Sequence, residues 1–280
     1  MALETILATI EERRNALWQK NQVLREEVEA LWRAQKNDLP SWLDKAKKSL
    51  AQKGCDVIEA ASPEDAGEIV EDLVGKGSVV HAYSPLLMSC GLPKRLRQKG
   101  LDVTEMHFGA LAAEWAEIDA AHPDFPAGNL EEGEILETFS KKLQVLEGIQ
   151  AGVQPERREV FLALRQYLRA KAAKAEYGIS GVSAVIAEHG SIVLSEDTGY
   201  MRAVSNLPPF HIAVIDSQQI VPTLDDAVHL LRAQAINRFG RDIETYLSII
   251  SGPSRTADIE FKMVNGVHGP KRVFAIVINA

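Results

Sequence analysis

The residues whose types and spacing could most readily do chemistry run from Ser251 to Glu260 and read Ser-Gly-Pro-Ser-Arg-Thr-Ala-Asp-Ile-Glu. A strand that ends in Gly-Pro and turns into a helix presents free backbone N–H groups at the carboxyl end of a sheet, where α/β proteins bind ligands. Hydroxyl groups and a guanidinium add donors for an anion. We therefore predict a small-anion site made by Gly252, Ser254, Arg255 and Thr256. In the alternative interpretation, a hydroxyl group caps the helix while Arg255 pairs with Asp258.

A second candidate is the sequence Glu188-His189-Gly190. A carboxylate beside a turn glycine at a strand end can act as a nucleophile or a base, with a histidine as proton carrier. We predict catalytic roles for Glu188 and His268, with His189 and Arg202 directed at the same ligand. The alternative is that His189 and Gly190 only form a turn, and that Glu188 and Arg202 face water.

The elements that must position these residues alternate between strand and helix. Ser62 starts a helix with a capping-box pattern, Gly178 is the expected C-cap of a helix that begins at Pro155, and residues 109–150 are helical and acidic. Such alternation implies right-handed crossovers and one continuous, mostly parallel sheet with flanking helices. The expected strands are Cys55–Glu59, Ser78–Tyr83, Leu101–His107, Ala184–Glu188, Ser191–Ser195, His211–Ile215, Tyr246–Ile250 and Val273–Ile278. The other expected helices are Pro85–Lys99, one that Thr223 caps, and a short one after Glu260, and a polar loop spans 196–210.

The first 50 residues are predicted to be a helical extension of an α/β domain that covers residues 51–280. Apolar residues recur at alternating steps of four and three, which is a heptad pattern, and Arg14 and Asn21 fill its two other seam positions. The seam predicts one long helix, broken at Asp38, Pro40 and Ser41, and then a second helix up to Gly54. It allows either pairing with a second copy of the chain or packing on its own domain. The apolar seam residues are Leu3, Leu7, Ile10, Leu17, Leu24, Val28 and Leu31.

Composition excludes several functions. The chain has 280 residues, is 46% hydrophobic and 25% charged, and has a formal charge of −8. The excess acid lies in residues 51–150, which carry 8 basic and 18 acidic groups, and a negative chain is a poor ligand for nucleic acids. Two cysteines cannot hold an iron–sulfur cluster, and the seven histidines lack metal-ligand spacing, so neither a metal nor a cofactor is predicted. Neither a signal peptide nor a membrane span is recognised, so we expect a cytosolic protein.

Taken together, eight stretches of sequence in this order closely resemble the LUD (lactate utilization protein) family, most of all its C-type members. The match is dense over residues 155–280 and looser over residues 50–150. The stretches are Gly178–Gly181, Ala187–Ser191, Gly199–Arg202, Leu207–Pro208, His211–Ala213, Ile220–Thr223, Ser251–Glu260 and Gly266–Pro270.

The resemblance implies a sheet like that of the sugar-phosphate isomerase and CoA-transferase superfamily. It also implies a role in oxidising L-lactate to pyruvate, in a complex with iron–sulfur partner subunits. Transferases of that superfamily use a glutamate near a glycine as acyl acceptor, and Glu188 stands in a similar Glu-x-Gly setting. The chain departs from the family in two ways: it has no Cys-rich ferredoxin segment like that of the B-type members, and His189 stands where a threonine or a small residue is usual.

Three functions remain as alternatives. The first is a cluster-free subunit of a lactate-oxidising complex that binds a small carboxylate or phosphate. The second is an independent acyl transferase or sugar-phosphate isomerase that uses Glu188 as nucleophile or base. The third is a non-catalytic ligand-binding scaffold that forms a homo-oligomer through its N-terminal heptads.

Overall fold

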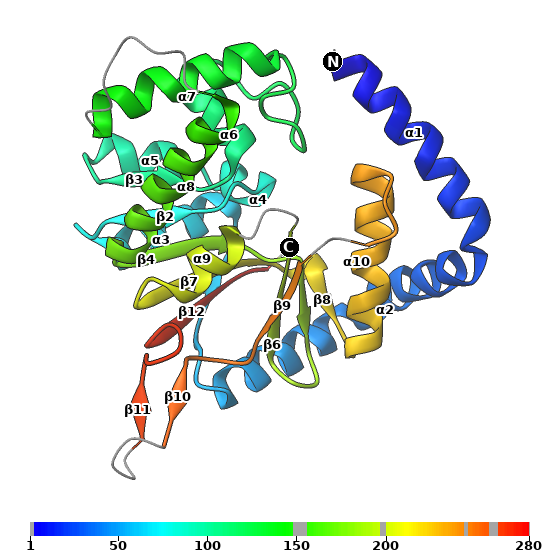
Figure 1. Cartoon of the computed structure of the whole chain (residues 1–280). Coiled ribbons are helices and arrows are strands. Elements are labelled where there is room, and N and C mark those ends of the chain that lie inside the picture. Colours follow the sequence, from blue (N-terminus) through cyan, green and yellow to red (C-terminus); the bar gives the residue numbers. More distant parts are fainter. Residues whose placement is uncertain (1–2, 148–155, 197–199, 244–245, 258–262, 280) are drawn as a thin grey trace.

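A six-stranded sheet, parallel throughout, forms the centre of the molecule (Figure 1). The computed structural model describes residues 3–147, 156–196, 200–243, 246–257 and 263–279. The α/β fold class predicted from the sequence is confirmed. In spatial order, the strands are β1 (Asp56–Ala60), β12 (Arg272–Ile278), β7 (Phe210–Asp216), β4 (Tyr177–Gly181), β2 (Val79–His81) and β3 (Val103–Glu105).

Helices cover the sheet unequally on its two faces. One face packs on α3 (Pro63–Val74), α4 (Pro85–Ser89) and α5 (Leu92–Gln98), which enclose a core with the sheet residues Ile179, Ile212, Val214 and Ile276. Over β2 and β3, the other face is covered by three helices and by Val204 of α9 (Tyr200–Asn206). These three helices are α6 (Phe108–Trp115), α7 (Glu132–Glu147) and α8 (Arg157–Lys174).

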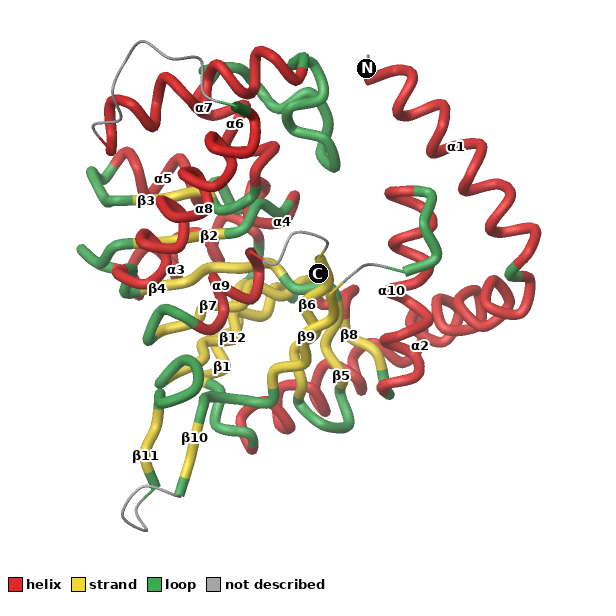
Figure 2. Tube along the Cα trace, viewed as in Figure 1, coloured by secondary structure: helices red, strands yellow, loops and turns green. Residues whose placement is uncertain are grey.

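The prediction of one continuous sheet is wrong, because the hairpin that follows β4 leaves the first sheet and builds a second one. The order of this second sheet is β8-β5-β6-β9, and the bounds are β8 (Ile220–Val221), β5 (Ala184–Ile186), β6 (Ser191–Glu196) and β9 (Tyr246–Ile250). Its Val185, Ile192 and Leu194 pack against β12 and β7, so burial of this apolar face holds the two sheets together. A two-stranded arm, β10 (Arg255–Thr256) and β11 (Val264–Asn265), extends away from both sheets (Figure 2).

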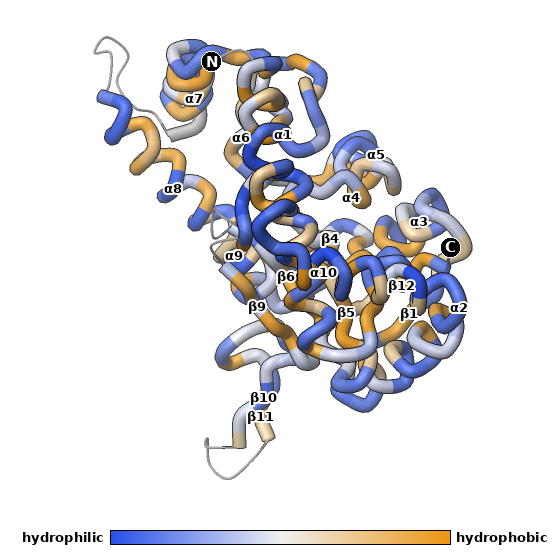
Figure 3. Tube along the Cα trace, turned by 90° about the vertical axis from the view of Figure 1, so that its right-hand side faces the viewer, coloured by the Kyte–Doolittle hydropathy of each residue, from blue (hydrophilic) through white to orange (hydrophobic). Residues whose placement is uncertain are grey.

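The N-terminal helix breaks at Asn21 and not at Pro40. Helix α1 (Leu3–Lys20) ends there, and α2 (Gln22–Gln52) continues through Pro40, which contradicts the predicted break at Asp38, Pro40 and Ser41. Leu31 before the proline and Trp42 after it belong to the same apolar cluster, so packing on both sides outweighs the lost backbone hydrogen bond. In Figure 3, α1 and α2 are mostly hydrophilic, whereas the strands of the sheets are mostly hydrophobic.

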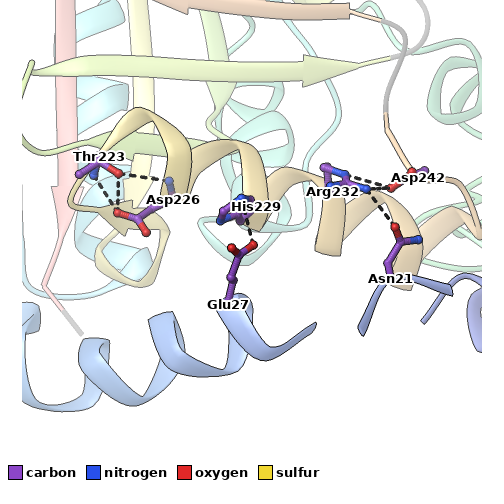
Figure 4. A network of polar contacts seen from close by, with 7 residues as sticks. All are labelled: Asn21, Glu27, Thr223, Asp226, His229, Arg232 and Asp242. Atoms are coloured by element: carbon purple, nitrogen blue, oxygen red, sulfur yellow. Dashed lines mark hydrogen bonds and ion pairs between the residues drawn. The ribbon is translucent and has the colours of Figure 1, made fainter. Parts of the chain in front are cut away.

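The part of the heptad seam that lies in α2 packs on the chain's own α10 (Leu224–Phe239). Leu24 and Val28 are buried against Ala233 and Ile236 of α10, with Leu17 at the edge of the cluster. Polar contacts along the same two helices add to this packing (Figure 4). His229 Nε2 lies 3.2 Å from a carboxylate oxygen of Glu27, and Arg232 bridges the Asn21 side chain and Asp242.

Several local predictions need correction. Gly178 lies inside β4 and is not a C-cap, the polar loop 196–210 contains α9, and the predicted helix Pro85–Lys99 is two helices divided at Gly91. The segment predicted to enter a helix after Pro253 is the strand pair β10–β11, and residues 258–262 lie outside the described residues. The capping boxes at Ser62 and Thr223 are confirmed in part: Thr223 and Asp226 form a full box, and Ser62 Oγ accepts the Asp65 N–H.

Within the described residues, no helix has the length and apolarity needed to cross a membrane.

A prediction follows from the close approach of α9 to β4. A methyl group on Gly178 would overlap the carbonyl oxygen of Val204, so we expect Gly178→Ala to lower the free energy of unfolding by about 1–3 kcal/mol. The matched control is Gly133→Ala in α7, where a methyl group meets nothing within 4 Å and should stabilise the helix by about 0.5–1 kcal/mol. Urea denaturation measures both values, and equal stability of the two variants would contradict the close approach.

Candidate functional site

A cavity of about 650 Å³ opens at the carboxyl ends of β2, β3 and β4. The chain leaves β2 toward β3 on one side, whereas β4 and the later strands extend on the other side, so the sheet has a topological switch point between β2 and β4. Parallel α/β sheets bind ligands at this position because neighbouring connections diverge there and leave a crevice. We call this space the switch-point cavity; it is lined from α1 and α10 on one side and from α7 and α8 on the other (Figure 1).

Aromatic rings form much of its wall. Phe125 meets Phe239 edge to face, with ring centroids 6.0 Å apart, which joins the loop before α7 to the end of α10. Phe108, behind the wall, meets both Phe161 and Tyr200 edge to face at 5.6 and 4.8 Å. The wall therefore presents several apolar surfaces to a bound molecule, and it is fixed by contacts between different elements.

His107 lies on the floor of the cavity, and its surroundings favour one protonation form of its ring. Its Nδ1 accepts the N–H of Ala110 at 3.2 Å and so caps α6. Burial lowers the pKa of His107, with a smaller effect from the positive charge of Arg238. The ring is therefore neutral, and because Nδ1 accepts, its proton lies on Nε2, which can donate to a ligand.

Below this floor lies a buried pair, Glu105 and His81, which are 2% and 3% exposed. One oxygen of Glu105 accepts the backbone N–H groups of Tyr83 at 3.0 Å and His107 at 2.8 Å. The other oxygen lies 3.4 Å from Nδ1 of His81. Burial raises the pKa of Glu105 to about 8 and lowers that of His81 to about 3, so both are neutral at neutral pH. Glu105 thus fixes two cavity residues without placing a negative charge beneath them.

Hydroxyl groups complete the polar part of the lining. Ser195 Oγ is buried and has no hydrogen-bond partner among the described residues, although the Ser195 backbone N–H donates to Ser183 Oγ at 3.0 Å. Ser84 Oγ approaches β4 closely because Gly181 has no side chain, and this hydroxyl does not cap α4. Burial raises the pKa of Tyr83, and it raises that of Tyr200 to about 12, so both phenols keep their protons.

The charges of the lining cancel. It contains three acidic residues, Asp124, Glu132 and Glu196, and three basic residues, Arg157, Arg238 and Arg241. Arg238 donates to Asp124 at 2.7 Å, and Arg157 lies 3.0 Å from Glu132. Glu196 accepts the backbone N–H of Met201 at 2.8 Å and that of Arg202 at 3.1 Å at the start of α9. The interior therefore offers neutral hydrogen-bonding groups, while the guanidinium groups of Arg157 and Arg238 keep further N–H donors at its walls.

None of the residues predicted from the sequence lines this cavity. Glu188 and His189 lie in the β5–β6 turn, where a carboxylate oxygen of Glu188 is 3.0 Å from His189 Nε2. The following Gly190, with φ of +62°, packs so closely on the backbone of Ser49 that a methyl group would overlap it. The β5–β6 turn therefore packs against the C-terminal end of α2.

The other predicted residues gather at the same end of α2. Arg255 donates to the carbonyl oxygen of Lys53, and Gly252 packs against the same peptide. Ser254 Oγ accepts the His268 N–H at 3.1 Å, and Thr256 follows in β10. A hydrogen bond of 2.7 Å between Ser191 and Ser251 joins this group to the Glu188 turn, whereas Arg202 is exposed on α9. The structure thus brings seven of the eight predicted residues to one region, in which Arg255 and Ser254 bond to backbone groups.

Sequence reasoning missed the residues of the cavity floor. Tyr83, Ser84 and His107 lie two or three residues past the ends of the short strands β2 and β3, where a parallel sheet presents side chains to a ligand. That placement was a usable signal, although weaker than a Gly-rich motif. Ser195 and Glu105 gave no such signal, because their roles depend on contacts between strands.

The described residues contain no group of three or more metal-ligating side chains. Cys55 and Cys90 are both buried, and burial raises the pKa of each thiol to about 11. They are therefore protonated at neutral pH and are poor nucleophiles and metal ligands.

Fold and cavity together describe an α/β protein with a cavity at the switch point of a parallel sheet. Residues 43–278 match the LUD domain family model, so the chain belongs to this family and the resemblance seen in the sequence is confirmed.

Relatives in this family are lactate utilization proteins. The chain is 39% identical over 108 residues to lactate utilization protein C of Halalkalibacterium halodurans, covering 39% of this chain and 46% of that protein. It is 25% identical over 246 residues to lactate utilization protein B of Bacillus subtilis, covering 86% of this chain and 48% of that protein. The chain thus spans about half the length of these relatives. A DUF162 family protein from Deinococcus radiodurans matches the structure with a TM-score of 0.46 and 18% identity, covering 86% of this chain and 98% of that one.

The raised pKa of Glu105 predicts how stability depends on pH. Its carboxyl group is protonated when folded and ionised when unfolded, so the free energy of unfolding falls as pH rises from 6.5 to about 8. The expected loss is about 2 kcal/mol. Below pH 6.5, buried His81 and His211, whose pKa values are lowered to about 3 and about 4, act in the opposite direction.

Urea denaturation at several pH values tests this effect. Glu105→Gln keeps an oxygen that can accept the two backbone N–H groups but does not titrate, so the decline should disappear in this variant. An unchanged decline would assign it to other groups.

Proposed function

We propose that this chain is a cluster-free subunit of an assembly that oxidises L-lactate to pyruvate, and that it binds a small carboxylate in the switch-point cavity. One observation carries the ligand part of this proposal. Ser84, Ser195 and Nε2 of His107 present hydrogen-bonding groups there without partners among the described residues. A carboxylate accepts from such donors, and the apolar walls strengthen these hydrogen bonds by excluding water.

The family supports the lactate part of the proposal, since the relatives are named lactate utilization proteins. Oxidation of lactate releases two electrons, and this chain has only two buried cysteines, whose thiols are protonated. The electrons must therefore pass to other groups, and iron–sulfur subunits are the partners we propose. A cytosolic location remains part of this proposal.

The region around Arg255 remains a second candidate for the anion. Gly252, Ser254, Arg255 and Thr256 lie together there with His268, but Arg255 already donates to the Lys53 carbonyl and Ser254 Oγ already accepts the His268 N–H. An anion would compete with these contacts and loosen the end of α2. This cost favours the switch-point cavity.

We predict that L-lactate, pyruvate and oxalate raise the melting temperature of the purified chain, and that Ser195→Ala reduces this shift. Loss of one hydrogen bond should weaken binding by about three- to tenfold. Ser41→Ala, on the exposed surface of α2, is the matched control and should keep the full shift. Arg255→Ala tests the second candidate: if this variant loses the shift while Ser195→Ala keeps it, the ligand binds beside α2.

We further predict that the isolated chain does not oxidise lactate. Without an added flavin or nicotinamide, turnover with an artificial electron acceptor should appear only when iron–sulfur partner subunits are added, because the two buried, protonated cysteines cannot pass electrons on. Robust turnover by the metal-free chain would contradict the proposal. Glu188→Gln distinguishes the alternative transferase function, which would lose its activity in this variant.

A further inference from the structure

The switch-point cavity is much larger than the proposed ligand. Cavities of about 300–1,000 Å³ hold molecules of drug or cofactor size, and this one measures about 650 Å³. A molecule as small as lactate fills only a fraction of that space. Bound on the floor beside His107 and Ser195, it leaves the aromatic wall uncovered.

The chemistry of the uncovered part is specific. Tyr83, Phe125, Phe161, Tyr200 and Phe239 line the cavity and supply flat apolar surfaces at several angles. The hydrogen-bonding groups near them are neutral: the phenol of Tyr83 keeps its proton, and the hydroxyl groups of Ser84 and Ser195 lie at the strand ends. Stacking surfaces together with neutral donors and acceptors suit a planar heterocycle, whose ring nitrogens and carbonyl groups need such partners.

The balance of charge limits what the heterocycle can carry. Three acidic and three basic residues line the cavity, so a ligand with several phosphates would meet no net positive field. Arg157 is largely exposed, 69% for its side chain, and pairs through Nε with Glu132, which leaves its other N–H groups for one phosphate. Arg238 likewise uses Nε and Nη2 on Asp124 and keeps further donors. The site therefore matches a single phosphate beside the ring.

We propose that the switch-point cavity binds a planar heteroaromatic mononucleotide, with its ring between the aromatic walls and its phosphate toward Arg157. The flavin, nicotinamide and adenine mononucleotides share this chemistry. The mononucleotide site rests on the proposed function only in so far as a small carboxylate binds beside the mononucleotide. It goes beyond the sequence analysis, which predicted no cofactor. A flavin or a nicotinamide at this place would lie next to the proposed carboxylate.

Titration of the full-length chain with flavin mononucleotide tests the proposal. Stacking on the aromatic wall should quench the flavin fluorescence in a saturable manner. Ser195→Ala should weaken this binding about three- to tenfold. Arg157→Gln should weaken binding of flavin mononucleotide but leave that of riboflavin, which lacks the phosphate, unchanged. Arg158→Gln, the exposed neighbour on α8 that does not line the cavity, is the matched control and should bind flavin mononucleotide normally.

The remaining arms identify the ring and separate the two proposals. Nicotinamide mononucleotide and AMP are tested by thermal shift, and binding of either one with the same sensitivity to Ser195→Ala and Arg157→Gln supports the mononucleotide site. The inference is overturned if no mononucleotide binds, or if binding ignores both substitutions. A melting-temperature shift with pyruvate in the same preparation would then leave the carboxylate proposal intact, whereas its absence would remove that proposal as well.

Discussion

Parallel pairing of six strands is the constraint on which the rest of this structure depends. It places every strand's carboxyl end on one edge of the sheet, where the backbone N–H groups that follow the strands need partners. Glu105 meets this need for Tyr83 and His107. At the end of β6 in the second sheet, Glu196 does the same for the first turn of α9. Because these carboxyl groups are engaged with backbone, the edge can be lined by neutral side chains, and the cavity that forms there does not repel an anion.

The most distinctive sequence of the chain serves a different end of the molecule. Gly190, Gly252 and Arg255 all contact the last turns of α2 or the peptide that follows, so two motif-rich loops hold one helix. Arg255 caps the helix in the manner expected of a cation beside free carbonyl groups. In turn, α2 buries Ala46 and Leu50 between the two sheets. The motifs that identify the family are therefore explained in part by packing, and a distinctive motif need not lie at the ligand site.

The fold was largely predictable from the sequence, and the cavity was not. Buried strands such as His211–Ile215 are nearly continuous apolar runs, so they can be recognised in the sequence. The capping patterns at Ser62 and Thr223 mark helix starts, because a cap is formed by hydrogen bonds between residues close in sequence. The break at Asn21 was missed because it depends on packing of α1 and α2 against α10, which no local pattern encodes. Glu105 was missed for the same reason: its burial and its two N–H partners arise from the pairing of β2 with β3. The sequence did not reveal the contacts between residues far apart in the chain, and these contacts form the cavity.

The acidic middle third of the chain acquires a structural meaning from these contacts. Glu71 pairs with Arg95 and Lys99 between α3 and α5, and Glu114 pairs with Arg97. Asp124 holds Arg238 at the cavity wall, while Glu105 is buried and protonated and contributes no charge at neutral pH. Part of the acidity counted in residues 51–150 is thus neutralised within the fold. The formal charge of −8 already counts both partners of each ion pair, so among these groups only protonated Glu105 makes the true charge less negative. The local pairing of acids with bases is why an acidic protein can offer an anion a cavity whose charges cancel.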